Sequence, residues 1–105
     1  MRLVVQRVGR AEVVCDGGAS AEIGRGSLVL VGLHRDDGPD DLDWCARKLL
    51  GLRIFSDAEG RLNRSLDDVD GELLCVPNFT LYGDCTEGRR PSFIEAMCAE
   101  EAGQL

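Results

Sequence analysis

Runs of β-branched and other apolar residues, separated by short turn signals, dominate the first third of the chain. Residues 2 to 8 (RLVVQRV) and 11 to 15 (AEVVC) are two such runs, and 16-DGG-18 is a turn signal of the hairpin kind. A third run, 27-SLVLVGL-33, is almost continuously apolar, which is typical of a central strand buried on both faces. The pattern therefore predicts that strands open the domain.

The next segment has the spacing of an amphipathic helix. Apolar side chains recur at i, i+3, i+4, i+7 and i+8 between residues 42 and 50. Pro39 suits the first turn, and the carboxylates of Asp40 and Asp41 would lie near the positive end of the helix macrodipole. We predict a helix over residues 39 to 51, with a strand at residues 52 to 55 after it.

The most apolar run of the second half, 73-LLCVPNFTLYG-83, is interrupted by a proline and an asparagine. If the run stays extended, alternate residues share a face. One face is then wholly apolar (Leu73, Cys75, Pro77, Phe79, Leu81), and the other ends in three polar groups (Asn78, Thr80, Tyr82). This polar end has the character of a pocket wall. The structural alternative is that Pro77 marks an edge strand, Asn78 satisfies a local turn and Thr80 serves β-propensity.

The C-terminal residues predict a second helix. From Pro91 onward, apolar residues have the spacing of a helix start, and they comprise Phe93, Ile94, Met97 and Cys98. The whole chain has 105 residues, of which 44% are hydrophobic and 30% charged, and this fits a single globular domain over residues 1 to 105. No apolar run is long enough to cross a bilayer and the N-terminus is unlike a signal peptide, so we expect a cytoplasmic protein without membrane contact.

Cofactor and metal motifs are missing from the sequence. The tripeptide 24-GRG-26 precedes a strand instead of joining a strand to a helix, which excludes a dinucleotide fingerprint. The five cysteines lack C-x-x-C spacing, so we expect reduced, mostly buried thiols, and His34 is the only histidine. We therefore expect no cofactor and no metal site.

The net charge of −7 argues against a general nucleic-acid binder, because non-specific affinity comes from basic groups that displace counterions from phosphates. DNA is therefore not an expected partner, and any RNA contact must be local. Arg89 and Arg90 in 87-EGRRPSF-93 could supply it, with Arg61 and Arg64 as additions. The alternative is that this segment is a solvated loop before a helix.

Familiar hydrolytic motifs are also missing: there is no G-x-S-x-G elbow, no H-E-x-x-H helix and no Walker loop. The remaining candidate for a hydrolytic site is the polar end of the apolar run, at residues 78 to 80. An activated ester needs little more than a water, a shaped pocket and backbone N–H groups aimed at the developing oxyanion. A catalyst without an ionisable side chain is consistent with such a substrate.

Four stretches of the chain resemble the D-aminoacyl-tRNA deacylases, also called D-tyrosyl-tRNA deacylases. They are 1-MRLVVQRVGRAEV-13, 23-IGRGSLVLVGL-33, 47-RKLLGLRIFSDAEGRLNRSL-66 and 72-ELLCVPNFTLYGDCTEGRRPSF-93. The resemblance implies a three-layer α/β fold in which mixed sheets form a partial barrel with two helices. It also implies a homodimer that binds the 3′ end of aminoacylated tRNA and hydrolyses the ester to a D-amino acid, using backbone groups and the 2′-hydroxyl of the terminal adenosine.

The family's Ser-Gln-x-Thr-Leu motif falls on residues 77 to 81, where the first two positions have changed to Pro77 and Asn78. The resemblance assigns catalysis to Asn78, Phe79 and Thr80, and substrate binding to Pro77, Leu81, Arg7, Arg89 and Arg90. Arg7 matches the arginine that braces the family's active site, and 88-GRRPSF-93 would lie near the tRNA end.

The family's Gly-Pro-x-Thr motif, which enters the partner subunit's pocket and enforces chirality, is not found in these 105 residues. The expectation is a truncated or short member with impaired hydrolysis. The alternative is a non-catalytic dimeric module that binds the tRNA end, or an inactive fragment.

Overall fold

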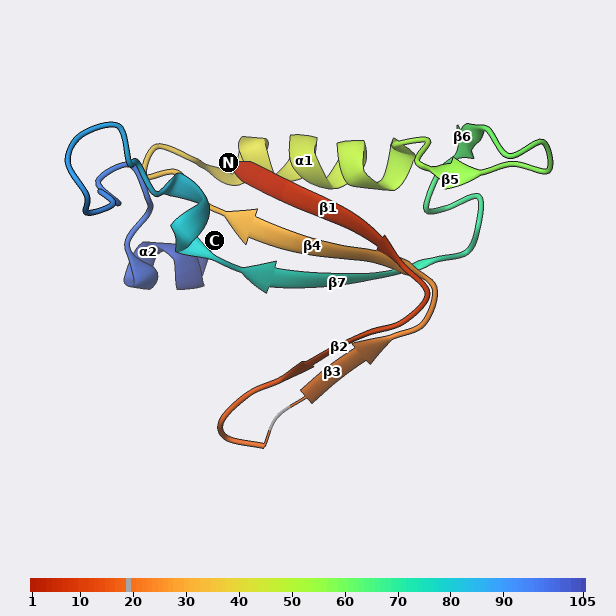
Figure 1. Ribbon diagram of the computed structural model, residues 1–105, viewed down its shortest axis with the longest axis horizontal. Helices are drawn as coiled ribbons and strands as arrows, with labels where there is room; N and C mark the ends of the chain where they lie inside the picture. The colour runs from red at the N-terminus through yellow and green to blue at the C-terminus, as the bar shows by residue number, and fades with distance from the viewer. Residues whose placement is uncertain (19) are drawn as a thin grey trace.

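A three-stranded mixed sheet forms the centre of the molecule (Figure 1). Its strands are β1 (Arg2–Val8), β4 (Gly26–Gly32) and β7 (Glu72–Pro77), in the order β1-β4-β7. β4 pairs antiparallel with β1 and parallel with β7. The computed structural model describes residues 1–18 and 20–105. The apolar run predicted as a central strand is indeed the strand in the middle.

Two antiparallel pairs lie at one end of this sheet (Figure 1). The first is the hairpin of β2 (Ala11–Val14) and β3 (Ser20–Ile23), and the second joins β5 (Phe55–Ser56) to β6 (Leu62–Arg64). The predicted hairpin is thereby confirmed, whereas the strand expected at residues 52 to 55 begins only at Phe55.

Three helical segments complete the fold. α1 (Pro39–Gly51) runs alongside the sheet, while the 3-10 turn η1 (Phe79–Tyr82) and α2 (Ala99–Gln104) lie at the end opposite the two hairpins (Figure 1). α1 has the predicted bounds, with Asp40 and Asp41 in its first turn. The mixed α and β architecture agrees with the predicted fold class. Among the described residues, no helix is both long and apolar enough to cross a bilayer.

The core is small and centres on β4. Val29 is completely inaccessible to solvent, and it pairs with Val5 of β1 and Cys75 of β7. The other buried apolar side chains surround it (Ile23, Phe55, Leu66, Leu74, Tyr82, Met97). These side chains come from both ends of the sheet, and their burial stabilises the turns that follow β4 and β7.

The prediction that the chain stays extended over residues 73 to 83 is wrong. The strand ends at Pro77, where no N–H is available to continue the ladder, and the chain then forms η1. Within β7 the buried side chain is Leu74, whereas Leu73 is 37% exposed and Cys75 is exposed. The face with Leu73 and Cys75, which has only apolar residues in the sequence pattern, is therefore the more exposed face of β7. The thiols are free in the described residues, but four of the five are exposed instead of buried.

The helix predicted from Pro91 is also absent from residues 91–98, and α2 begins at Ala99. Long-range hydrogen bonds explain the difference. The Ser92 and Asp84 backbones exchange two bonds, and the Met97 N–H donates to the Leu33 carbonyl at 2.9 Å. These contacts tie the segment to the end of β4 in an extended path, and tertiary pairing overrides the local helical spacing.

Candidate functional site

The turn that follows β7 is anchored to the end of β4. Pro77 pairs with Val31, and the Asn78 N–H donates to the Val31 carbonyl at 2.7 Å. The Asn78 side-chain oxygen then accepts two hydrogen bonds, from the Thr80 N–H at 3.1 Å and from the Thr80 hydroxyl at 2.5 Å. Asn78 is thus the N-cap of η1, a position that favours asparagine.

Capping leaves two donors of this turn open. The Phe79 N–H and the Asn78 side-chain NH2 have no hydrogen-bond acceptor among the residues described. Both groups belong to residues that line the same cavity. Donors of this kind, held by a capped turn beside an apolar space, are suited to stabilise a developing oxyanion.

The cavity beside these donors has a volume of about 730 Å³, within the range of small-molecule sites. Its lining is mainly apolar, and comes from the ends of β4 and β7, from residues 93 to 98 and from α2. Phe79 and Phe93 meet edge to face with ring centroids 5.1 Å apart. The cavity could accept an apolar or aromatic side chain next to the open donors.

A glycine allows this aromatic pair to form. A Cβ at Gly83 would lie 3.1 Å from the Phe93 ring and 3.1 Å from the Thr80 carbonyl oxygen. Both distances are tighter than ordinary carbon contacts, so a side chain at this position would push the Phe93 ring away from η1.

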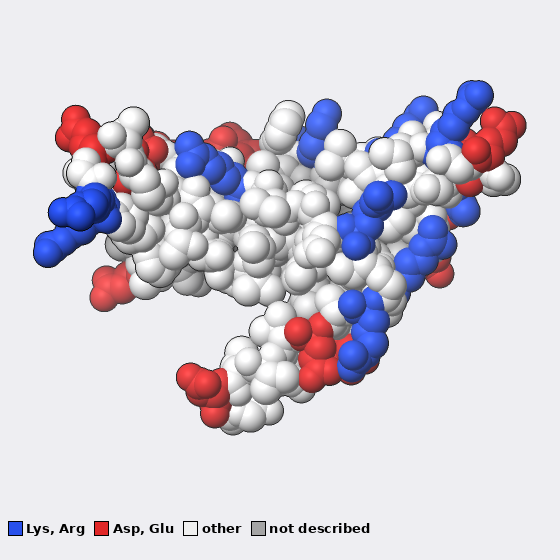
Figure 2. Space-filling model, in the orientation of Figure 1, with Lys and Arg blue, Asp and Glu red and all other residues white. Residues whose placement is uncertain are grey.

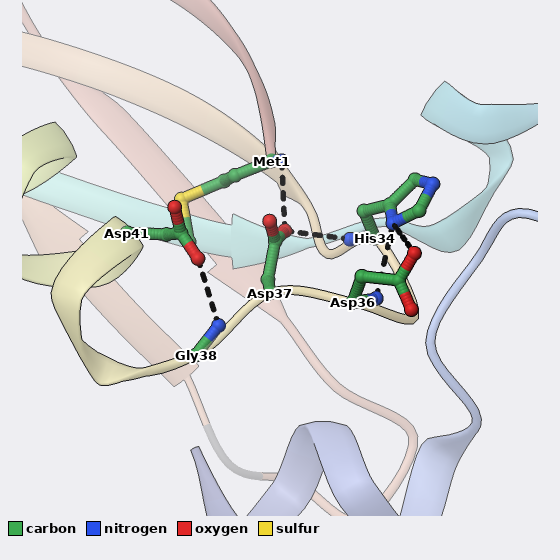
Figure 3. A network of polar contacts seen from close by, with 6 residues as sticks. All are labelled: Met1, His34, Asp36, Asp37, Gly38 and Asp41. Atoms are coloured by element: carbon green, nitrogen blue, oxygen red, sulfur yellow. Dashed lines mark hydrogen bonds and ion pairs between the residues drawn. The ribbon is translucent and has the colours of Figure 1, made fainter.

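A polar network centred on Asp37 lies close to η1 (Figure 3). The Asp37 carboxylate accepts a bond from the Met1 amino group at 2.7 Å and one from the His34 N–H at 2.7 Å. Burial works to raise the pKa of Asp37, but these bonds and the charge of the amino terminus outweigh it and hold the pKa below its ordinary value. The network joins the start of β1 to the loop before α1.

Tyr82 connects this network to the turn. The Arg2 guanidinium lies 4.5 Å from the centre of the Tyr82 ring and donates to the Leu81 carbonyl at 2.9 Å. His34 packs edge-on against the same ring, with centroids 5.4 Å apart. Burial, followed by the Asp37 charge, raises the pKa of the Tyr82 phenol. η1 is therefore held by the amino-terminal residues as well as by β4.

The structure brings some of the predicted site residues together and separates others. Pro77, Asn78 and Phe79 line the cavity, and Thr80 is adjacent but directs its hydroxyl to Asn78. Leu81 is half-buried behind the turn and does not line the cavity. Arg7 pairs with Ser27 of β4, whereas Pro77 pairs with Val31, four residues further along the same strand. Within one chain, Arg7 therefore lies at the opposite end of the sheet from Pro77.

Arg89 and Arg90 lie in the exposed loop between Asp84 and Ser92, whose backbones close its base. Figure 2 shows Lys and Arg side chains also at the end that carries β5 and β6, together with Asp and Glu side chains. The predicted additions Arg61 and Arg64 belong to this other end, beside or within β6.

Sequence reasoning missed several residues that hold the site. Arg2 and Asp37 were missed because their contacts to Leu81 and to the Met1 amino group join residues more than 30 positions apart. Phe93 was predicted as an apolar residue of a helix and lies in a stretch that matches the family, but its position in the cavity depends on the Asp84 and Ser92 pairing. No group of three or more metal-ligating side chains occurs in the ranges 1–18 and 20–105.

Comparisons with known proteins give one consistent result. A family model described as D-Tyr-tRNA(Tyr) deacylase matches residues 4–105. A protein of Clostridium novyi named D-aminoacyl-tRNA deacylase is 51% identical over 105 residues, which is 100% of this chain and 70% of the relative. One of Desulfitobacterium hafniense, with the same name, is 53% identical over the same shares of the two chains.

Among solved structures, one titled c-Myc DNA Unwinding Element Binding Protein superimposes with a TM-score of 0.86 at 40% identity. The match covers 99% of this chain and 70% of that one. The chain therefore spans about 70% of the length of the relatives it matches.

Proposed function

Because the chain belongs to the D-Tyr-tRNA(Tyr) deacylase family, we propose that it hydrolyses the ester bond between a D-amino acid and tRNA, releasing the free D-amino acid and the tRNA. The observation that carries the proposal is the pair of open donors at the cavity, the Phe79 N–H and the Asn78 amide. The family resemblance assigns catalysis to Asn78, Phe79 and Thr80.

The reaction needs a water, an oxyanion site and a leaving group. Water attacks the ester carbonyl carbon, and the carbonyl oxygen takes up negative charge in the tetrahedral intermediate. The open donors of Phe79 and Asn78 stabilise that charge. The C–O bond to the terminal ribose then breaks and a proton passes to the ribose oxygen. As the family resemblance implies, the neighbouring 2′-hydroxyl of the tRNA assists, so no side-chain nucleophile is required.

The roles of the remaining residues follow from their positions. The apolar cavity next to Phe79 and Phe93 receives the side chain of the amino acid, and Pro77 forms part of its wall. Thr80 keeps Asn78 oriented through two hydrogen bonds. Arg89 and Arg90, on the exposed loop after η1, contact phosphates close to the tRNA 3′ end.

We further propose a cytoplasmic homodimer. The support for a dimer is the amount of apolar surface left open on one chain: Val4, Phe79 and Ile94 are 48%, 57% and 73% exposed. Arg7, which lies at the other end of its own sheet, would then serve the site across the subunit boundary. Light scattering of the purified chain tests the dimer, and a monomer at all concentrations would contradict it.

A second candidate is a non-catalytic module that binds the tRNA end. The observation that favours it is coverage, because the matched residues make up only 70% of each relative. Measuring deacylation of D-tyrosyl-tRNA together with tRNA binding separates the two candidates, since the module would bind without turnover.

The experiment that tests catalysis removes the backbone donor itself. Phe79→Pro deletes the N–H at the first position of η1, where proline is tolerated, while Phe79→Ala deletes the ring and keeps the N–H. We expect Phe79→Pro to deacylate D-tyrosyl-tRNA about 100-fold more slowly than Phe79→Ala. Equal rates for the two variants would contradict the proposed oxyanion site.

A further inference from the structure

The second half of η1 is held by a side chain from the first strand. The Arg2 guanidinium donates to the Leu81 carbonyl at 2.9 Å and lies 4.5 Å from the centre of the Tyr82 ring. In the part of the chain that the structure describes, the Leu81 carbonyl has no other hydrogen-bond donor. Arg2 thus satisfies a carbonyl that the end of a helical turn leaves open.

The strand register explains how Arg2 reaches this carbonyl. Arg2 pairs with Gly32 of β4, and a Cβ at Gly32 would lie 2.8 Å from the Leu81 Cβ. η1 therefore rests on Gly32, and the Arg2 side chain reaches the turn from the neighbouring strand. Because paired residues of adjacent strands point to the same face of a sheet, the guanidinium lies on the face that η1 covers.

Arg2 does not line the substrate cavity. It borders a separate polar hollow of about 340 Å³, which shares no lining residue with the cavity at Asn78 and Phe79. Arg2 can therefore influence a reaction in the cavity only through η1 or through its charge.

A hydrogen bond inside η1 links Leu81 to the proposed oxyanion donor. The Leu81 N–H donates to the Asn78 carbonyl at 3.4 Å, which closes the 3-10 turn. That carbonyl and the Phe79 N–H belong to one planar trans peptide group, in which the C=O and N–H bonds point in opposite directions. The position of Leu81 therefore sets the direction of the Phe79 N–H.

We propose that Arg2 is a positioning residue of the deacylase site, which holds the Leu81 carbonyl and thereby directs the Phe79 N–H toward the developing oxyanion. This inference rests on the proposed function, which gives that N–H its role. Oxyanion stabilisation depends on donors that are in place before the reaction, so a small rotation of this peptide lowers the rate without unfolding the chain. The exposed position of Arg2 agrees with a role other than core packing.

Residual dipolar couplings of the isotope-labelled chain test this geometry without a substrate, because they report the direction of each N–H bond relative to the sheet. We expect Arg2→Met to change the coupling of the Phe79 N–H and to leave the couplings of β4 as in wild type. Arg2→Lys, which keeps a charge and a donor, should leave the Phe79 coupling unchanged. The matched control is Arg10→Met, which removes a surface cation that is paired with Glu12 and Glu22.

An unchanged Phe79 coupling in Arg2→Met would overturn the proposal, and so would an equal change in Arg10→Met. Arg2→Gln, whose side chain is too short to reach the Leu81 carbonyl, repeats the test if Arg2→Met does not fold.

Kinetics on D-tyrosyl-adenosine measure the effect on the reaction, because this substrate carries the ester but no RNA phosphate that a cation could bind. We expect Arg2→Met to lower kcat about tenfold with KM within about twofold of wild type, and Arg2→Lys to recover most of the loss. A rise in KM at unchanged kcat would overturn the positioning role, because it would mean that Arg2 contributes to substrate binding instead.

A double-mutant cycle identifies the donor through which Arg2 acts. Phe79→Pro has no N–H left to position, so adding Arg2→Met to it should change kcat by less than about twofold. In Phe79→Ala, which keeps the N–H, Arg2→Met should again lower kcat about tenfold. Equal losses in the two backgrounds would overturn the proposal. If wild type hydrolyses no D-tyrosyl ester, the proposed function fails, while the dipolar couplings still decide whether Arg2 directs the Phe79 N–H.

Discussion

The side-chain oxygen of Asn78 accepts two hydrogen bonds from Thr80, one from its backbone N–H at 3.1 Å and one from its hydroxyl at 2.5 Å. The Asn78 oxygen is therefore occupied, and its NH2 group is the part that remains free for a ligand. The two halves of one amide thus have separate roles, the oxygen in stabilising η1 and the nitrogen in binding.

This division predicts different outcomes for two substitutions. Asn78→Asp keeps a capping oxygen and loses the NH2, so we expect stability within about 0.5 kcal/mol of wild type and deacylation slower by about 100-fold. Asn78→Ala also loses the cap and should cost about 1 kcal/mol in addition. Urea denaturation and D-tyrosyl-tRNA deacylation measure the two effects, and full activity in Asn78→Asp would show that the amide nitrogen has no catalytic role.

Gly32 provides a test of how closely η1 must sit on β4. A Cβ at Gly32 would lie 2.8 Å from the Leu81 Cβ and 3.3 Å from the Asn78 carbonyl oxygen. We expect Gly32→Ala to lower the free energy of unfolding by about 1 to 3 kcal/mol and to displace the turn, which lowers kcat. Gly51→Ala is the matched control, because a Cβ there meets no atom within 4 Å. A fully active Gly32→Ala would show that the turn tolerates displacement.

The Asp37 network predicts a pH dependence of stability. Because the folded pKa of Asp37 is below its ordinary value, its contribution is present above the unfolded pKa and is lost as pH falls through the folded pKa. We expect Asp37→Asn to cost about 2 kcal/mol at pH 6 and to flatten the decline of stability toward pH 3. Asp36→Asn, whose side chain is 81% exposed, should change neither. Parallel pH curves for Asp37→Asn and wild type would contradict this role.

The coverage of the relatives predicts the effect of adding sequence. The open apolar surface around the cavity, with Phe79 57% and Ile94 73% exposed, lacks the walls that would hold a substrate in one orientation. We expect the 105-residue chain to deacylate D-tyrosyl-tRNA slowly but measurably, and to act no better on L-tyrosyl-tRNA. Fusion of the part of the Clostridium novyi relative that these 105 residues do not match should raise the D-specific rate by at least tenfold.

The control for that fusion is Asn78→Gln in the 105-residue chain, which restores the family residue without adding any wall. We expect it to leave the rate low. Rapid, D-specific deacylation by the unmodified 105-residue chain would show that the added segment is dispensable.

Local signals in the sequence were sufficient for the elements that depend on neighbouring residues. The helix over residues 39 to 51 was predictable because its apolar spacing, Pro39 and the acidic first turn all favour the same structure. β4 and the β2–β3 hairpin were predictable for the same reason, since an apolar run and a turn signal are read within a few residues. Residues 77 to 81 were selected as a site because a proline and an amide interrupt an apolar run, and the family resemblance gave them a role.

The tertiary structure decided what depends on distant partners. η1 replaces the expected strand because the Asn78 N–H donates to the Val31 carbonyl and the Asn78 side chain caps the turn. Leu74, which pairs with Leu28 of β4, is buried and Leu73 is not. Residues 91–98 do not form a helix because the Met97 N–H donates a hydrogen bond to the Leu33 carbonyl. The separation of Arg7 from Pro77 likewise follows from the strand register, which no periodicity within a single segment encodes.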